Sequence, residues 1–245
     1  TTLFRSHSMD PAGAGSVCCV RVVRSLMTLK DMSSMQFPRQ LFPRLGSRPQ
    51  AVWWQSTDWE DVEQLVPQGH DGREGYTGRP IWLILPQTQW PAADEMAAEW
   101  LAQGIRVFRS VPRGSTPPGQ LGPLPLAFVY QMRPVLVVAE AFLSQLPTEG
   151  WRYLSGLVVL VGQTRLADQP RGLIHPGLVQ SWTMPLLVLL PESAPWRDWP
   201  ALLAGRVVQG NYDVSLEATH SVLVAQNPVL WALIADWWSL RFFRG

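Results

Sequence analysis

Four short apolar runs constrain the fold of this chain more than any other feature of its sequence. They lie within Ile81–Leu85, Arg133–Ser144, Leu154–Val161 and Pro185–Leu190. Strands that are covered on both faces are apolar throughout, whereas strands with one wet face alternate between apolar and polar residues. We therefore expect these runs to be strands of a buried, mainly parallel sheet. Arg133–Ser144 is expected to be the central strand, leading directly into a helix.

Helical patterns lie between and after these runs. The first pattern starts at Pro91 and stops at Gly104, two residues that are typical of helix starts and ends. Its apolar residues share one helical face: Ala93, Met96, Ala97, Trp100 and Leu101. Ile105–Phe108 follows as a strand and completes a βαβ unit. A second one-faced pattern predicts a C-terminal helix from Pro228 to about Arg241.

This succession of elements predicts an α/β fold, in which a mainly parallel sheet carries helices on both faces. Other segments are less regular. Ala51–Gln55 predicts a strand, and Arg206–Gln209 predicts a weaker one. Asp58–Val66 is either a short helix capped by Asp58 or a second strand, and we favour the helix. Leu124–Tyr130 has no clear pattern.

The apolar and helical patterns predict one domain over residues 49–245, preceded by an N-terminal segment of residues 1–48 without a clean period. The first six residues resemble the translation of a sequencing-library adapter, as expected of a metagenomic assembly, and they are kept out of the fold prediction. The rest of that segment could contain a leader. It has no clear signal peptide, so we expect a cytoplasmic protein.

Composition narrows the possible functions. Hydrophobic residues make up 47% of the 245 residues and charged residues 16%, as in a compact globular protein. A net charge of +1 provides no basic surface, so we expect no nucleic-acid partner. No apolar run approaches the roughly 20 residues of a membrane span. The only cysteines, Cys18 and Cys19, are adjacent, and no Cys or His spacing suits a metal, so we expect neither a metal nor a cofactor.

One loop and the order of the elements carry a resemblance to a known family. Glu217–Val222, between a weak strand and the C-terminal helix, contains His220 and resembles the histidine loop of α/β-hydrolases. In that superfamily the histidine follows the last strand and precedes the last helix. The resemblance covers roughly residues 80–243, and it is strongest to a bacterial group of uncharacterised α/β-hydrolase-like proteins.

The resemblance implies where a nucleophile should stand. In the superfamily the nucleophilic serine lies in a Gly-x-Ser-x-Gly turn between a strand and a helix. The matching segment here is Ala139–Leu143, so Ala141 falls at the nucleophile position and has no hydroxyl. Ser144 is the candidate replacement.

The resemblance also implies the other parts of a catalytic site. His220 is the candidate base, and Glu192 is the candidate acid that would orient it, with Asp198 as a second candidate. The matching oxyanion loop contains Gln87 and Thr88, whose amides or side chains could stabilise an oxyanion.

Three functions remain open. The leading hypothesis is a catalytically degenerate α/β-hydrolase-like protein that binds a small molecule or a partner in the former active-site cleft. The second is an active hydrolase of ester or acyl bonds that uses His220 with activated water or an unusual nucleophile. The third is a structural interaction module whose tryptophan-rich C-terminal helix, with Trp231 and Trp238, binds a partner or a second copy of the chain.

Overall fold

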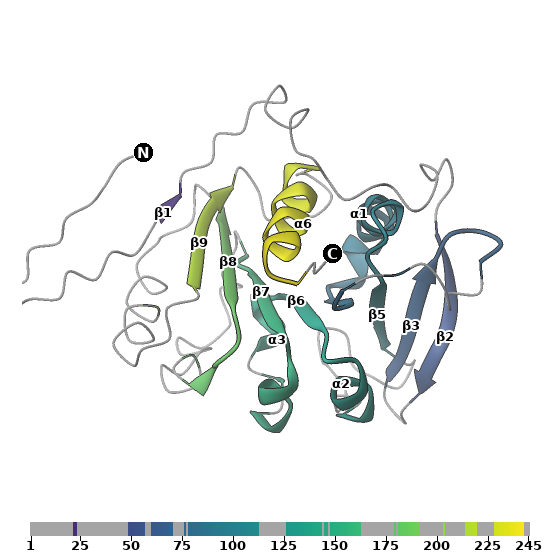
Figure 1. Cartoon of the computed structure of the whole chain (residues 1–245), viewed down its shortest axis with the longest axis horizontal. Helices are drawn as coiled ribbons and strands as arrows, with labels where there is room; N and C mark the ends of the chain where they lie inside the picture. Colours follow the sequence, from purple (N-terminus) through teal and green to yellow (C-terminus); the bar gives the residue numbers. More distant parts are fainter. Residues whose placement is uncertain are drawn as a thin grey trace, which may run out of the picture.

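The structure is a computed structural model that describes residues 22–23, 49–56, 60–70, 76, 78–112, 126–143, 145–146, 148–162, 179, 181–191, 203, 214–219 and 228–242. In these residues nine strands form one sheet in the order β1-β9-β8-β7-β6-β4-β5-β3-β2 (Figure 1). Neighbours from β1 to β5 run parallel, and only the pairs β5–β3 and β3–β2 are antiparallel. The predicted mainly parallel α/β architecture is confirmed.

The four apolar runs form adjacent strands in the middle of this sheet. They are β4 (Ile81–Ile84), β6 (Val135–Ala139), β7 (Gly156–Leu160) and β8 (Leu186–Pro191). Almost every residue in them is buried, because helices cover both faces of this part of the sheet. The prediction of a buried parallel sheet from these runs is therefore correct.

Helices lie on both faces of the sheet (Figure 1). One face carries α1 (Trp90–Ala102) and α6 (Pro228–Phe242). The other carries α2 (Leu126–Met132), α3 (Glu140–Leu143) and the 3-10 helix η3 (Thr148–Tyr153). None of the described helices is long and apolar enough to cross a bilayer.

Successive residues of each central strand belong to different cores. Val135 and Val137 pack with α1 and α6, whereas Leu136 and Val138 pack with the helices of the opposite face. This follows from the strand geometry, in which neighbouring side chains point to opposite faces. The predicted end of α1 is also correct, because the helix stops at Ala102 and Gly104, with φ +78, follows the C-cap residue Gln103.

The predicted helix over Asp58–Val66 is wrong. Glu60–Val66 is the strand β3, which pairs with both β2 (Gln50–Ser56) and β5 (Val107–Pro112). Val62 packs in one core and Leu65 in the other, so this segment buries both of its faces. Two antiparallel neighbours satisfy its backbone hydrogen bonds, and this outweighs the local preference for a capped helix.

Two further segments differ from expectation. The helix α2 (Leu126–Met132) overlaps the region Leu124–Tyr130, for which the sequence has no clear pattern. The strand next to β8 is β9 (Val214–Thr219), and β1 (Val22–Val23) pairs with its outer edge. Glu217 and Thr219 therefore lie in a strand rather than in the predicted histidine loop. The weak strand predicted at Arg206–Gln209 lies outside the described residues.

Candidate functional site

The expected nucleophile position lies at the carboxyl edge of the parallel sheet. Ile84 of β4 pairs with Val138 of β6, so these two neighbouring strands leave the sheet side by side. β6 continues without a loop into α3, and Ala141 is the second residue of this helix. Its side chain is half-buried.

The backbone at the junction of β6 with α3 has no residue with a positive φ. Of the described non-glycine residues, only Arg133 has a positive φ, at 47°, so no residue of Ala139–Leu143 adopts that conformation. In α/β-hydrolases the nucleophile stands on a sharp, strained strand-to-helix turn. Leu143, at the position of the second glycine of that motif, is fully buried and belongs to the core under α3.

The candidate oxyanion loop follows β4 at the same edge. Gln87 and Thr88 belong to the 3-10 turn η2 (Gln87–Gln89), which leads into α1, and both side chains are exposed. The backbone N–H of Gln89 donates to the Pro86 carbonyl oxygen at 2.8 Å, and this hydrogen bond closes the turn. The indole of Trp90 donates to the carbonyl oxygen of Leu85 at 3.2 Å. The turn is thus held against the end of β4.

The ends of β8 and β9 are also in register. Pro191 pairs with Thr219, whose hydroxyl donates to the Leu190 carbonyl oxygen at 3.5 Å. In the sequence the next residues are Glu192 and His220, the candidate acid and base. Both lie outside the described residues, as do Ser144 and Asp198, so their roles remain predictions.

A group of ionisable side chains between β9 and α6 was not anticipated. Burial raises the pKa of Glu217, and the neighbouring carboxylate of Asp236 raises it further, while Arg241 lowers it. Burial also raises the pKa of Asp236. Arg241 donates to the Ser215 hydroxyl at 3.5 Å. These contacts depend on the packing of α6 against β9. Because the sequence did not predict this strand, it contained no local signal for the contacts.

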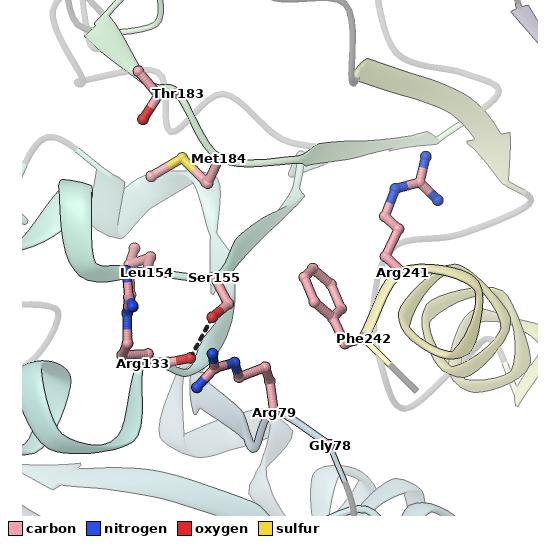
Figure 2. A pocket seen from close by; sticks show the side chains of 9 residues that line it. All are labelled: Gly78, Arg79, Arg133, Leu154, Ser155, Thr183, Met184, Arg241 and Phe242. Carbon is pink, nitrogen blue, oxygen red and sulfur yellow. Dashed lines mark hydrogen bonds between the residues drawn. The ribbon is translucent and has the colours of Figure 1, made fainter. Parts of the chain in front are cut away.

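A cavity of about 610 Å³ lies at the opposite, amino edge of the sheet (Figure 2). The described residues that line it precede β4, β6, β7 and β8 or end α6: Gly78, Arg79, Arg133, Leu154, Ser155, Thr183, Met184, Arg241 and Phe242. Sequence reasoning missed this cavity. One signal was present, because the dipeptide Arg-Pro occurs directly before the apolar runs of both β4 and β6.

Comparisons with known proteins identify the architecture. No protein-family model matches this chain, and no curated protein matches it either. Among solved structures, the chain is similar to the esterase Est22, with 10% identity, a TM-score of 0.53, and coverage of 82% of this chain and 83% of that one. It is also similar to a cold-adapted esterase from an Arctic intertidal metagenomic library, with 14% identity and a TM-score of 0.51. That alignment covers 75% of this chain and 89% of the esterase.

These likenesses extend over most of both chains, but at such low identities they define architecture and not activity. The chain has an α/β-hydrolase-like fold.

Proposed function

We propose that this protein is a catalytically degenerate α/β-hydrolase-fold protein that binds a small molecule or a partner at the carboxyl edge of its sheet. The observation that carries the proposal is the junction between β6 and α3. Ala141 supplies a methyl group where a serine hydroxyl would attack a carbonyl carbon. No residue from Ala139 to Leu143 has the positive φ of a strained turn.

The packing around this junction supports the same proposal. A glycine two residues after the nucleophile lets the backbone of the turn approach its neighbours closely. Here that position is Leu143, which is fully buried in the core between α3 and the sheet. A core leucine stabilises the short helix where a reactive turn would need space. The junction is thus suited to packing and not to presenting a nucleophile.

Binding at this edge is supported by the neighbouring turn η2. Gln87 and Thr88 are exposed there and offer amide and hydroxyl groups to a ligand. The turn is held in place by the hydrogen bond of Gln89 to Pro86 and by that of Trp90 to Leu85. Fixed polar groups at the carboxyl ends of parallel strands are typical of ligand sites in α/β folds.

A second candidate function is hydrolysis of ester or acyl bonds by water that His220 activates. The specific observation in its favour is the register of Pro191 with Thr219, because Glu192 and His220 directly follow this pair in the sequence. A carboxylate beside a histidine can orient the imidazole as a general base.

Two assays on the same purified protein separate these functions. The first is covalent labelling by a fluorophosphonate probe, which reports an activated serine. The second is turnover of p-nitrophenyl butyrate, which reports hydrolysis by any nucleophile. The variants are His220→Ala, Ser144→Ala and Ala141→Ser.

A degenerate protein gives no labelling and no turnover above that of His220→Ala. It also gives no labelling of Ala141→Ser, because a hydroxyl alone does not create the strained turn. Labelling of the wild type that Ser144→Ala abolishes would overturn the proposal in favour of a serine hydrolase. Turnover without labelling that is lost in His220→Ala would overturn it in favour of activated water.

A further inference from the structure

The cavity at the amino edge of the sheet is built by two matching segments. Ile81 of β4 pairs with Val135 of β6, so the dipeptides Arg79-Pro80 and Arg133-Pro134 precede neighbouring positions of parallel strands. The N–H of Val135 also donates to the Pro80 carbonyl oxygen at 2.8 Å. Arg79 and Arg133 therefore occupy neighbouring backbone positions at the amino edge of the sheet. Figure 2 shows both of them with Ser155 in the wall of the cavity.

The backbone of each arginine is held by specific hydrogen bonds. The carbonyl oxygen of Arg133 accepts a 2.7 Å hydrogen bond from the Ser155 hydroxyl, and its N–H donates to Val129 at 2.9 Å. Its φ of 47° is rare for a residue with a side chain, because the Cβ then lies close to the following carbonyl oxygen. The carbonyl oxygen of Arg79 accepts a 2.8 Å hydrogen bond from the indole of Trp238.

Positive charge predominates among the described residues of this wall. The described lining residues include three arginines and no carboxylate. Figure 2 shows Arg241 turned toward β9, where it contacts Ser215 and lies near Glu217. Arg79 and Arg133 are exposed, and within the described parts of the chain no carboxylate forms an ion pair with either of them. Because both arginines line the same cavity, an anion bound there would be attracted by both positive charges.

The rest of the wall combines apolar and hydroxyl groups. Ser155 and Thr183 contribute hydroxyls, and the smaller apolar part comes from Phe242 and from the buried side chains of Leu154 and Met184. The volume of about 610 Å³ falls within the usual range of small-molecule sites, about 300–1,000 Å³. A guanidinium group matches the geometry of a carboxylate or a phosphate, to which it donates two parallel hydrogen bonds.

We propose that the amino-edge cavity binds a small organic anion, whose carboxylate or phosphate contacts Arg79 and Arg133 and whose apolar body packs against Met184 and Phe242. This second site goes beyond the function proposed above, because it lies at the opposite edge of the sheet from Ala141. Its test uses binding alone and does not depend on whether the protein hydrolyses esters.

The experiment is isothermal titration calorimetry of the full chain with four probes. Octanoate and octyl phosphate combine an anion with an apolar chain, inorganic phosphate is the anion alone, and octanol is the chain alone. The variants are Arg79→Gln and Arg133→Gln. Arg152→Gln is the matched control, because it removes one exposed charge close in sequence to Leu154 but outside the cavity lining. Circular dichroism and thermal melting establish that each variant is folded.

We expect octanoate or octyl phosphate to bind saturably, with whichever binds more tightly identifying the preferred anionic group. Arg79→Gln and Arg133→Gln should each weaken that binding by about tenfold or more, as the loss of a charge-assisted hydrogen bond does. Arg152→Gln should leave it within about twofold, as expected for a screened surface charge. Added salt should weaken binding to the wild type.

Three results would overturn the proposal. One is the absence of saturable binding of either amphiphilic anion to the wild type. Another is an equal loss of affinity in Arg152→Gln and the two cavity variants, which would indicate a general charge effect. The third is binding of octanol as tight as that of the anions. If Arg79→Gln does not fold, Arg79→Lys provides the same test, because it keeps the charge and loses the paired hydrogen bonds.

Discussion

The indole Nε1 of Trp238 donates a 2.8 Å hydrogen bond to the carbonyl oxygen of Arg79. This bond joins the C-terminal helix α6 to the residue just before Pro80 and β4, across 159 positions of the sequence. Trp238 is only 1% exposed, and Trp237 on the same helix is also buried. The tryptophans at this end of α6 thus belong to the core, and Leu240, which is 75% exposed, is the large apolar side chain that α6 offers to solvent.

Trp238→Ala should be one of the most destabilising substitutions in the chain. Removal of a buried aromatic side chain leaves a cavity and costs about 3–5 kcal/mol. Trp238→Phe keeps most of the packing and loses the hydrogen bond to Arg79, so it should cost less, about 1–2 kcal/mol. Urea unfolding followed by circular dichroism measures both values. An equal effect of the two variants would contradict this account of the contact.

The predicted self-association through α6 has a matched test on the same helix. Leu240→Gln changes an exposed residue and should alter the free energy of unfolding by no more than about 0.5 kcal/mol. If α6 mediates a dimer, Leu240→Gln should lower the mass measured by size exclusion with light scattering. A dimer that persists in this variant would place the interface elsewhere.

Gly78→Ala should destabilise the protein more than Gly69→Ala. Both glycines have a positive φ, +71° and +81°, so an alanine at either position costs about 1 kcal/mol in backbone strain. A Cβ at Gly78 would also lie 2.8 Å from a ring carbon of Trp238 and 2.9 Å from the carbonyl oxygen of Phe242. At Gly69 nothing lies within 4 Å. The free energies of unfolding of the two variants, obtained from thermal melts, should therefore differ by roughly 1 kcal/mol or more.

Arg109 links three elements and should be sensitive to substitution. Its guanidinium group contacts Glu63 of β3 at 3.0 Å and Asp94 of α1 at 2.7 Å, and it lies 5.4 Å from the ring centroid of Trp90. Arg109→Ala leaves two partly buried carboxylates without their cation and should cost about 2 kcal/mol, between the values for exposed and buried pairs.

A double-mutant cycle of Arg109→Ala with Asp94→Asn measures this link by chemical denaturation. The two substitutions should be less destabilising together than the sum of their separate effects. Strictly additive effects would mean that the ion pair contributes nothing to stability.

Stability should fall as pH rises through the titration of Glu217. Burial and Asp236 raise its pKa above the ordinary value of 4.5, so the folded protein keeps this proton at pH values where the unfolded chain has released it. The neutral carboxyl therefore stabilises the fold below about pH 4.5, and this contribution is lost as pH rises through the higher, folded-state pKa.

Glu217→Gln should flatten that decline and raise the free energy of unfolding at pH 7, as measured by urea titrations at several pH values. Glu99→Gln, at an exposed position of α1, is the matched control for the loss of one carboxylate. If the stability of the wild type instead rises with pH through this range, and Glu217→Gln removes that rise, the pKa of Glu217 is lowered and not raised by folding.

The sequence predicted the junction of β6 with α3 but not the cavity at the amino edge of the sheet. The junction of β6 with α3, including Ala141, was predictable because a buried strand leading into a helix is a local pattern. The amino-edge cavity was not, since Arg79, Arg133 and Phe242 meet only when parallel strands start at one edge and α6 packs across them. The Arg-Pro repeat before β4 and β6 became meaningful only once these strands were known to be neighbours.

The sequence by itself determined the central strands β4, β6, β7 and β8 and the helices α1 and α6. Continuous apolar runs and one-faced helical patterns are properties of single segments, so they can be recognised without knowing what lies beside them. Only the tertiary structure decided the strand β3 and the strand β9. Their polar residues resemble helix or loop in isolation, and it is their neighbours, β2 and β5 for one and β8 and β1 for the other, that satisfy their backbone hydrogen bonds.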